Sequence, residues 1–516
     1  MNSQTKKRKL PETVELKSRF RNTIGKYTIK RSSKCISCGL CAELCPYGVH
    51  PRYENYAKPI RPRDHKCIGF KCKENDFYCI DQCPEQALTL RLNPMLDTLG
   101  DYRWTAEMLI AHWEMAETGE LPVVDLEYNI GKSGGGFDKI RFKHPNPQDY
   151  VEISDEDIDT SLVLNKRNDG RPVKVLSFPC YGGGMSYGSM ALSALVGRAR
   201  AAKRINSLTC TGEGGYPKEF IPYADHVITQ VATGLFGVRE ETILYTPIAE
   251  FKYAQGAKPG LGGHLLGDKV TPEVAAMRET VVGSSLFSPF PFHSVYSVED
   301  HKKHVDWIKE INPRVLISVK VSTPTDVDMV AVGSYYAGAH IVHIDGSYGG
   351  TGAAPDIAKK NIAMPIEYAI PKVHGFLKEE GVRDEICLIA SGGIRNAMDV
   401  AKAMALGADG VVIGTADLVA MECVRCGNCE SGRGCARGIA STDSELGRMT
   451  TEEYAEQRIV NMYMAWRKQW CEMLRQFGMT GMKELTGRSD LLVHLDYLDE
   501  EERSKYQAAL KAETII

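Results

Sequence analysis

The sequence predicts an α/β protein in which a (β/α)8 TIM-type barrel follows a small cysteine-rich module and precedes a helical C-terminal region. Three observations predict this order. Eight cysteines gather between Cys35 and Cys83, and short apolar runs alternate with helical stretches from about residue 172. Residues 446–516 are charged, with apolar residues at helical spacing from Tyr454 to Phe477. About eight strands favour a closed barrel, whereas fewer would favour a doubly wound sheet.

Composition excludes several classes of protein. The 516 residues, 43% of them hydrophobic and 25% charged, suffice for two or three domains with a large core and exclude a disordered chain. A net charge of −3 gives no field that would attract nucleic acid or an anionic membrane. The best candidate for a membrane span, around Gly410–Met421, is too short and is broken by Asp417. The basic run at residues 6–9 precedes no apolar segment, so we expect a solvated tail, with a nucleic-acid arm as the alternative, and no secretory signal.

Changes in composition divide the chain into five segments. We expect an N-terminal arm at 1–30, a two-cluster iron–sulfur module at 31–95, a connecting segment at 96–171, the barrel at 172–445 and the helical region at 446–516. Within the connecting segment, Trp104–Ala116 has helical character and residues 132–136 form a flexible glycine-rich loop. Clustered thiols in a long chain favour metal binding in the cytoplasm over a secreted disulfide scaffold.

The N-terminal cysteines follow two iron–sulfur patterns. The first is Cys35-x2-Cys38-x2-Cys41-x3-Cys45-Pro46, and the second, with longer gaps, is Cys67-x4-Cys72-x6-Cys79-x3-Cys83-Pro84. This spacing resembles the two-cluster ferredoxins, in which the last cysteine of each run binds the other cluster. The resemblance implies two [4Fe–4S] clusters, one held by Cys35, Cys38, Cys41 and Cys83 and the other by Cys67, Cys72, Cys79 and Cys45. A structural zinc site is the alternative, but it does not explain two C-x3-C-P tails.

Eight apolar runs are predicted as the strands of the barrel. They are Val173–Phe178, Ser207–Cys210, His226–Val231, Ile248–Tyr253, Val315–Val321, Ile341–Ile344, Ile386–Ala390 and Val411–Ile413. Helices are predicted between them, for example at Ala191–Arg204, Ser297–Ile311, Ala363–Glu380 and Ala397–Leu406.

Glycine-rich turns follow several of these strands. They are Pro179–Ser189, Thr211–Gly215, Gln255–His264, Gly349–Pro355, Ser391–Arg395 and Gly414–Ala416. Glycine lets backbone N–H groups approach a flat ligand or an anion closely, and the last two turns lie where αβ barrels bind phosphate. One such turn carries little information, but a series of them at strand ends indicates a cofactor site.

The ordered set of turns, with Ser318-Val319-Lys320 among them and a cysteine cluster behind them, resembles the FMN domain of glutamate synthase over roughly residues 172–445. Together with the N-terminal module, the chain resembles the short, archaeal-type members of that family. The resemblance implies an FMN-bearing αβ barrel that reduces 2-iminoglutarate, formed from 2-oxoglutarate and ammonia, to L-glutamate.

The resemblance also assigns cofactor-binding roles. Met185 and Ser186 would lie against the isoalloxazine ring, and Gln230 would meet its pyrimidine edge. Lys320 would lie near N1 and the C2 carbonyl, where a cation stabilises developing negative charge. The phosphate would be held by Gly392, Gly393, Gly414 and Thr415.

Substrate roles follow in the same way. Glu213 and Lys258 would serve imine formation, because a carboxylate can move protons and an ammonium can polarise a keto acid. Lys252 and Arg278 would bind carboxylates, although an exposed helical position is an equal alternative for Arg278. His264, where large-chain glutamate synthases have Gln, is placed in the substrate pocket. The remaining thiols, Cys180, Cys210, Cys387 and Cys471, are expected to be inert and buried.

Some positions depart from the family pattern. Phe292 lies where the family reads His in Pro-Pro-Pro-His-His-Asp, and Ser347 and Tyr348 replace His and Asp of Gly-His-Asp-Gly-Gly. These changes remove acid and imidazole groups from the expected pocket. They raise the alternative of a related oxidoreductase acting on another imino acid or an N-alkyl amino acid.

A third cysteine group, Cys423-x2-Cys426-x2-Cys429-x5-Cys435, follows the last predicted strand. Family members hold a [3Fe–4S] cluster here with three cysteines, which Cys423, Cys429 and Cys435 would match. Cys426 is additional, so a [4Fe–4S] cluster is slightly favoured, with [3Fe–4S] and a zinc knuckle as alternatives.

The sequence also predicts partners. We find no glutaminase-type N-terminal cysteine, so ammonia is expected from solution or from a glutaminase subunit. A dinucleotide fingerprint after a strand is also missing, which favours an NAD(P)H-oxidising flavoprotein or a ferredoxin as external electron donor, in a homo- or hetero-oligomer. An electron-transfer subunit with an inactive barrel is a third hypothesis, and Glu213, Lys258 and Lys320 argue against it.

Overall fold

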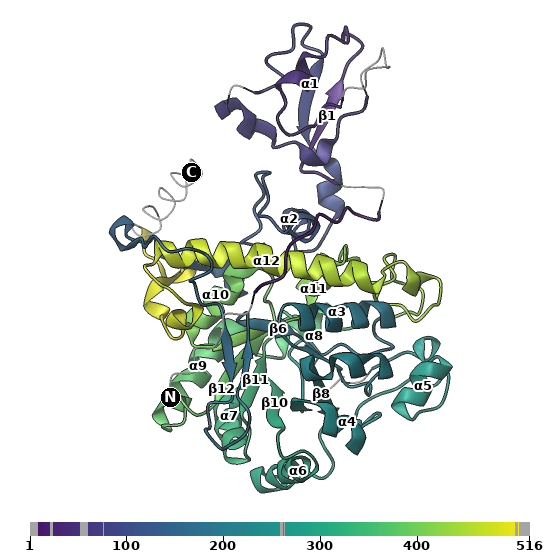
Figure 1. The fold of residues 1–516 in the computed structure, drawn as a ribbon, viewed down its shortest axis with the longest axis vertical. Helices are drawn as coiled ribbons and strands as arrows, with labels where there is room; N and C mark the ends of the chain where they lie inside the picture. The colour runs from purple at the N-terminus through teal and green to yellow at the C-terminus, as the bar shows by residue number, and fades with distance from the viewer. Residues whose placement is uncertain are drawn as a thin grey trace.

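The protein is described by a computed structural model that covers residues 9–20, 24–51, 60–75, 77–258, 262, 264–500 and 504. Within these residues, eight parallel strands form the large sheet, in the order β6-β13-β12-β11-β10-β9-β8-β7. A bridge between Gly184 and Cys210 joins the two outer strands, so the sheet closes into the barrel that the sequence predicts (Figure 1). The strands are β6 (Cys180–Gly182), β7 (Thr209–Cys210), β8 (Val227–Ala232), β9 (Ile248–Lys252), β10 (Leu316–Ser322), β11 (Ile341–Asp345), β12 (Cys387–Ser391) and β13 (Gly410–Ile413).

Helices follow the strands and surround the barrel (Figure 1). They are α3 (Leu192–Arg204), α4 (Glu240–Tyr245), α5 (Pro272–Arg278), α6 (Val298–Ile311), α7 (Val327–Tyr336), α8 (Asp356–Asn361), α9 (Ile366–Glu379), α10 (Ala397–Leu406) and α11 (Thr415–Ala420). The long α12 (Glu452–Gln476) packs across α3, α10, α11 and α2 (Ala106–Thr118). Its buried face includes Trp466 and Trp470, which join the main hydrophobic core.

The prediction of Val173–Phe178 as the first strand of the barrel is wrong. Residues 174–176 form β5 (Lys174–Leu176), which pairs antiparallel with β4 (Leu162–Leu164) outside the barrel sheet. Leu164 and Leu176 pack against the residues that begin the barrel strands, such as Ile248 and Ile341, so this hairpin closes the N-terminal end of the barrel. The true first strand, β6, is three residues long and includes a glycine, which made it look like part of the turn that follows.

The cysteine-rich module stands apart from the barrel, above α2 and α12 in Figure 1. Its strands β1 (Tyr27–Arg31) and β2 (Leu88–Leu92) pair antiparallel, and it contains the short helix α1 (Leu40–Leu44). Its own core is small, with Tyr27, Ile29 and Val49 among its few buried residues. Lys26 ties the module to the connecting segment through the carbonyl of Asp125 (2.6 Å) and the carboxylate of Glu107 (3.0 Å).

The terminal and connecting segments hold to the barrel through specific hydrogen bonds. In the N-terminal arm, the backbone of Val14 exchanges hydrogen bonds with the side chain of Asn461 on α12. The glycine-rich loop at 132–136, expected to be flexible, is anchored because Gly136 N–H donates to Glu367 at 2.7 Å. In the C-terminal region, expected to be helical, β14 (Leu492–His494) also pairs with β3 (Ile140–Phe142).

Two predictions from the sequence concern the basic N-terminal tail and the absence of a membrane span. Residues 6–8 of the basic tail lie outside the described residues. Across the part of the chain that the structure describes, no helix is both long enough and apolar enough to cross a bilayer.

Candidate functional site

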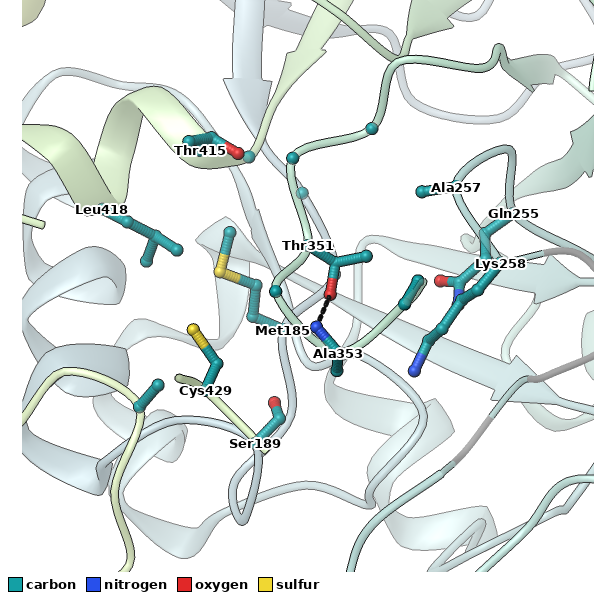
Figure 2. Close-up of a pocket in the computed structure, with 18 of the residues that line it drawn as sticks. Met185, Ser189, Gln255, Ala257, Lys258, Thr351, Ala353, Thr415, Leu418 and Cys429 are labelled. Carbon is teal, nitrogen blue, oxygen red and sulfur yellow. Dashed lines mark hydrogen bonds between the residues drawn. The ribbon is translucent and has the colours of Figure 1, made fainter. Parts of the chain in front are cut away.

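A cavity of about 590 Å³ lies at the C-terminal ends of the barrel strands, within the range typical of small-molecule sites. Lining residues come from most of the barrel loops, from the connecting segment and from the 423–435 loop. Figure 2 shows Lys258 and Gln255 entering from one side and Met185, Leu418 and Cys429 from the other. Every barrel residue to which the sequence assigned a cofactor or substrate role lines this cavity, as do the four cysteines of that loop: Met185, Ser186, Glu213, Gln230, Lys252, Lys258, His264, Arg278, Lys320, Gly392, Gly393, Gly414, Thr415, Cys423, Cys426, Cys429 and Cys435.

On one side of the cavity, the floor is formed by backbone atoms. A Cβ added at Gly184 would lie 2.9 Å from Gln230 Nε2 and 3.2 Å from Cys210 Sγ. A Cβ on Gly212 would lie 2.7 Å from the backbone nitrogen of Ser186. Because these glycines keep side chains out, the backbone after β6 can face a flat ligand directly.

The opposite side of the cavity is formed by glycines after β11, β12 and β13. Gly392 and Gly393 have φ values of +95° and +91°, which disfavour any other residue. A Cβ on Gly350 would overlap the hydroxyl of Thr415. A Cβ on Gly414 would meet only Met185 Cε, at 3.7 Å, so this backbone opens into the cavity.

Among the described residues, two cations of the cavity form no ion pair. Arg278 is 2% exposed and donates to Ser186 Oγ (2.8 Å) and to the carbonyl of Tyr187 (2.9 Å). Neither Arg278 nor Lys258 has an ion pair with any described residue, and Arg278 Nε has no hydrogen-bond partner there. Burial lowers the pKa of Arg278 to about 10 and also lowers the pKa of Lys258. Each charge is therefore held at a cost that a bound anion would offset.

Lys252 and Glu213 are a pair in this structure. Lys252 Nζ lies 2.6 Å from Glu213 Oε1, and Ser288 donates to Glu213 Oε2 at 3.2 Å. Lys252, which the family resemblance assigns to a substrate carboxylate, is thus engaged by the carboxylate of the same chain. His264 stacks on Phe287, with ring centroids 4.9 Å apart, and forms part of the cavity wall.

Beneath the cavity, a buried polar layer crosses five neighbouring strands. Glu250 on β9 accepts from Gln230 Nε2 (2.7 Å) and Ser318 Oγ (3.0 Å), and its Oε2 lies 3.1 Å from His343 Nδ1. Burial opposes the charge of Glu250, but these hydrogen bonds and the charge of Lys320 bring the pKa of Glu250 down to about 2.

The layer continues toward the cavity. His343 Nε2 lies 2.7 Å from Ser391 Oγ, and this hydroxyl donates to Asp345 at 2.5 Å. Asp345 also accepts from the N–H of Gly256 and lies 3.8 Å from Lys320 Nζ. Lys320 is 8% exposed, and the neighbouring carboxylates of Asp345 and Glu250 raise its pKa despite its burial.

Of the three positions that depart from the family pattern, only Tyr348 reaches the cavity. Its ring lies under the guanidinium of Arg103, 4.8 Å from the ring centroid, and beside Gly393. Phe292 instead packs against Phe251 and Tyr253, away from the cavity. Ser347 is fully buried and does not line it either.

The 423–435 loop forms one wall of the cavity. A Cβ on Gly352 would lie 2.9 Å from Cys429 Sγ. Lys269 stabilises the loop by donating hydrogen bonds to the carbonyls of Cys429 (2.6 Å) and Ala440 (2.9 Å). Arg425 joins the loop to the connecting segment through Asp101, at 2.7 Å.

In the N-terminal module, four cysteines surround one small pocket: Cys45, Cys67, Cys72 and Cys79. This set takes one cysteine from the first sequence run and three from the second, as the crossed pattern of ferredoxins requires. His50 Nε2 lies 3.4 Å from Cys79 Sγ. The four scattered cysteines are buried as expected, and burial raises the pKa of Cys210 and Cys387 to about 12.

Sequence reasoning missed the layer beneath the cavity. Glu250 and His343 lie inside runs that were interpreted as apolar strands, and Asp345 directly follows the second of these runs. A charged residue within such a run is costly unless it is paired, and that cost is the signal that could have identified them. Asp101 and Arg425 were also missed, because residues 324 positions apart give no sequence signal.

The fold and the site together define a class of protein: a (β/α)8-barrel enzyme with a cation-lined cavity at its strand ends and two cysteine-rich segments. Comparison with known proteins narrows this class. The family described as "Conserved region in glutamate synthase" matches residues 140–480, and "4Fe-4S binding domain" matches residues 29–49.

Named relatives agree with this match. The archaeal-type glutamate synthase [NADPH] of Thermotoga maritima is 36% identical over 481 residues, covering 89% of this chain and 92% of that protein. The archaeal glutamate synthase [NADPH] of Methanocaldococcus jannaschii is 36% identical over 488 residues, covering 89% and 93%. The glutamate synthase [NADPH] large chain of Azospirillum brasilense is 35% identical over 329 residues, which are 61% of this chain and 22% of that one. The chain belongs to the glutamate synthase family and is an oxidoreductase with a 4Fe–4S binding motif.

Proposed function

We propose that this protein reduces 2-iminoglutarate, formed from 2-oxoglutarate and ammonia, to L-glutamate, with electrons that pass through iron–sulfur clusters to FMN in the barrel cavity. The observation that carries the proposal is the pair of cations, Lys258 and Arg278, which face one cavity without an acidic partner among the described residues. A substrate with two carboxylates supplies the missing negative charge. A monocarboxylate leaves one of the two cations unpaired in a desolvated pocket.

The residues of the cavity fit FMN. The glycines at 184 and 212 leave room for a flat ring against the backbone, and Gly392, Gly393, Gly414 and Thr415 offer a glycine-lined end for a phosphate. Gln230 and Lys320 would meet the polar edge of the ring, while Met185 and Ser186 would lie against its face. Bound there, FMN supplies hydride transfer, which no side chain can provide.

The chain's own residues would bind the substrate and move its protons. Arg278 and Lys258 hold the carboxylates, and Lys258 also polarises the keto group during imine formation. Glu213 takes up and returns the protons of that step, and Lys252, at 2.6 Å from Glu213 Oε1, holds this carboxylate in place. His264 and Phe287 wall the pocket and exclude water.

We assign three iron–sulfur clusters to the cysteines. Two [4Fe–4S] clusters would occupy the N-terminal module, and the shared pocket of Cys45, Cys67, Cys72 and Cys79 supports the crossed assignment. Cys423, Cys426, Cys429 and Cys435 line the barrel cavity together, which supports a four-thiolate [4Fe–4S] site, with [3Fe–4S] as the alternative. About twelve iron atoms per chain are expected for three cubes, and about eleven for the alternative.

The cluster assignment is tested with Cys426→Ser. If Cys426 is a ligand, the EPR signal of the third cluster changes and the iron content falls. An unchanged signal would remove Cys426 from the ligand set and favour the three-iron cluster.

The route of electrons and the source of ammonia are part of the same proposal. An NAD(P)H-oxidising flavoprotein or a ferredoxin would reduce the N-terminal clusters, and ammonia would come from solution or a glutaminase subunit. The short segment between β2 and Asp101, which binds the 423–435 loop through Arg425, gives the module a direct connection to the cavity wall.

A second candidate is reduction of another imino acid or of an N-alkyl amino acid, and Tyr348 at the cavity favours it. Phe292 and Ser347, which also suggested it, do not line the cavity. Tyr348 lies beside Gly393, at the end of the cavity proposed for the phosphate of FMN. The glutamate reaction therefore keeps the stronger support.

The test is anaerobic turnover with reduced viologen, ammonia and a panel of keto acids, following reoxidation of the flavin by its absorbance. We expect 2-oxoglutarate to reoxidise the flavin much faster than pyruvate or glyoxylate. Equal rates with pyruvate would reject the dicarboxylate proposal. A preference for an alkylamine over ammonia would select the second candidate.

A further inference from the structure

In the polar layer beneath the cavity, the pattern of hydrogen-bond donors and acceptors determines which atoms carry protons. An ionised carboxylate only accepts hydrogen bonds, and a serine hydroxyl has one proton to donate. Asp345 accepts from the N–H of Gly256 at 2.8 Å and lies beside the ammonium of Lys320, so it is the ionised acceptor in this layer. The Ser391 hydroxyl therefore donates its proton to Asp345.

The same count of donors and acceptors then applies to the two ring nitrogens of His343. Because the Ser391 proton points at Asp345, only a lone pair of Ser391 faces His343 Nε2 at 2.7 Å, so Nε2 must carry a proton. On the other side of the ring, Nδ1 faces the carboxylate of Glu250 at 3.1 Å and must also carry one. Both ring nitrogens are donors only in the imidazolium.

We propose that His343 is a buried imidazolium that balances Glu250 and Asp345, so that the charge of Lys320 remains available to the cavity above it. With His343 charged, the layer contains two carboxylates and two cations and is neutral. With His343 neutral, the layer would carry one net negative charge beneath the site where a reduced flavin develops its own. His343 contacts neither the cavity nor a ligand and acts as a positioning residue.

Glu250 has a related positioning role. Its carboxylate can only accept, so the amide of Gln230 must turn its nitrogen toward Glu250. The amide oxygen of Gln230 is thereby left free to accept a hydrogen bond from the cavity side. Such an oxygen suits the N3–H donor on the pyrimidine edge of a flavin.

The surroundings of His343 are consistent with a fixed charge. Besides the four charged residues of the layer, the titratable described groups that interact with it are Cys210 and Tyr181, with Glu213 near Lys320. Cys210 and Tyr181 are buried, and burial raises the pKa of each, so both stay neutral. The charge balance therefore depends on His343, Glu250, Asp345 and Lys320.

The first test is neutron diffraction from crystals of the oxidised holoenzyme exchanged into D2O. We expect deuterium at both ring nitrogens of His343 and on Ser391 Oγ, directed at Asp345. A ring nitrogen without deuterium overturns the proposal. This result does not depend on the substrate, so it remains separate from the keto-acid test of the proposed function.

The second test is the two-electron midpoint potential of the bound flavin in His343→Gln, which removes the charge. We expect the preference of the site for reduced over oxidised FMN to fall at least tenfold, which for two electrons is about 30 mV. Ser318→Ala is the matched control, because Ser318 binds the same oxygen of Glu250 without a charge and should leave the potential near that of the wild type. An unchanged potential in His343→Gln contradicts the proposal. If that variant does not fold, the neutron result decides alone.

Discussion

The two ends of the barrel differ in whether their charged side chains have partners of opposite charge. At the N-terminal end, Asp409 accepts from Lys166 (2.6 Å), from Arg383 (3.0 Å) and from the N–H of Leu388 (2.8 Å). At the C-terminal end, Lys258 and Arg278 face the cavity without an acidic partner among the described residues. Burial alone therefore does not identify the functional end, whereas a buried charge that the chain leaves uncompensated does.

The largest effect should come from breaking the compensated end. Asp409→Asn leaves the buried Arg383 and the half-buried Lys166 without their carboxylate, and removing one partner of such a network costs about 3–5 kcal/mol. We expect this loss in the free energy of unfolding, measured with urea by tryptophan fluorescence. Asp490→Asn is the control, because Asp490 and Arg488 form an exposed pair that should contribute less than about 1 kcal/mol. Equal losses in the two variants would contradict the comparison.

The same network predicts a dependence on pH. Arg383 and Lys166 outweigh burial and lower the pKa of Asp409 below its ordinary value of 3.8. A carboxylate whose pKa is lower in the folded chain stabilises the fold above the unfolded pKa, and this contribution is lost as the pH falls through the folded value. We expect the wild type to lose this stability below about pH 4, and Asp409→Asn to show a smaller change over that range.

Lys320→Ala tests the cation nearest the polar layer. Loss of a group that stabilises developing negative charge typically costs a hundredfold or more in rate, so we expect slower flavin reduction or loss of FMN. Stopped-flow reduction and flavin content after purification measure the two outcomes. Lys302→Ala, at an exposed position of α6, should match the wild type. Wild-type reduction together with full FMN content would reject the role of Lys320.

Arg278→Met sharpens the comparison at the open end. Hydrogen bonds to a charged group contribute about 1.5–3 kcal/mol, so the apparent KM for 2-oxoglutarate should rise roughly tenfold to a hundredfold. The free energy of unfolding should stay the same or rise, because an apolar side chain replaces an uncompensated buried charge. Arg239→Met, which breaks the exposed pair with Glu279, is the control. A large loss of stability with an unchanged KM would make Arg278 a structural residue.

The smallest predicted effect is the uptake of a fraction of a proton when 2-oxoglutarate binds. The pKa of Lys258 is lowered by burial and by the nearby charge of Lys252, and a bound carboxylate should raise it again. Binding of 2-oxoglutarate near pH 9 should therefore take up protons, which calorimetry in two buffers of different ionisation enthalpy measures. Lys258→Met should abolish most of this uptake. Proton release on binding by the wild type would place Lys258 away from the ligand.

The sequence supported prediction of the barrel because seven of its strands are apolar runs between helices. It failed at β6, because a three-residue strand that ends in glycine has no pattern of its own. The glycine-rich turns predicted a cofactor site at the strand ends, and the resemblance to the glutamate synthase family assigned its individual residues. The pairing of Lys252 with Glu213, and the layer formed by Glu250 and His343, could not be predicted, since strand pairing alone determines which side chains meet.

The close approach of Gly350 to Thr415 has a consequence for how this protein can change in evolution. A methyl group at position 350 would overlap the Thr415 hydroxyl, although the backbone at 350 permits alanine. Replacing Thr415 by alanine would relieve the overlap but leave a Cβ–Cβ distance of 3.0 Å, and replacing it by glycine would remove the conflict. Position 350 can therefore change only after position 415 has changed, and substitutions at the two positions should be strongly non-additive. Lineages that carry alanine at 350 would have had to change position 415 first.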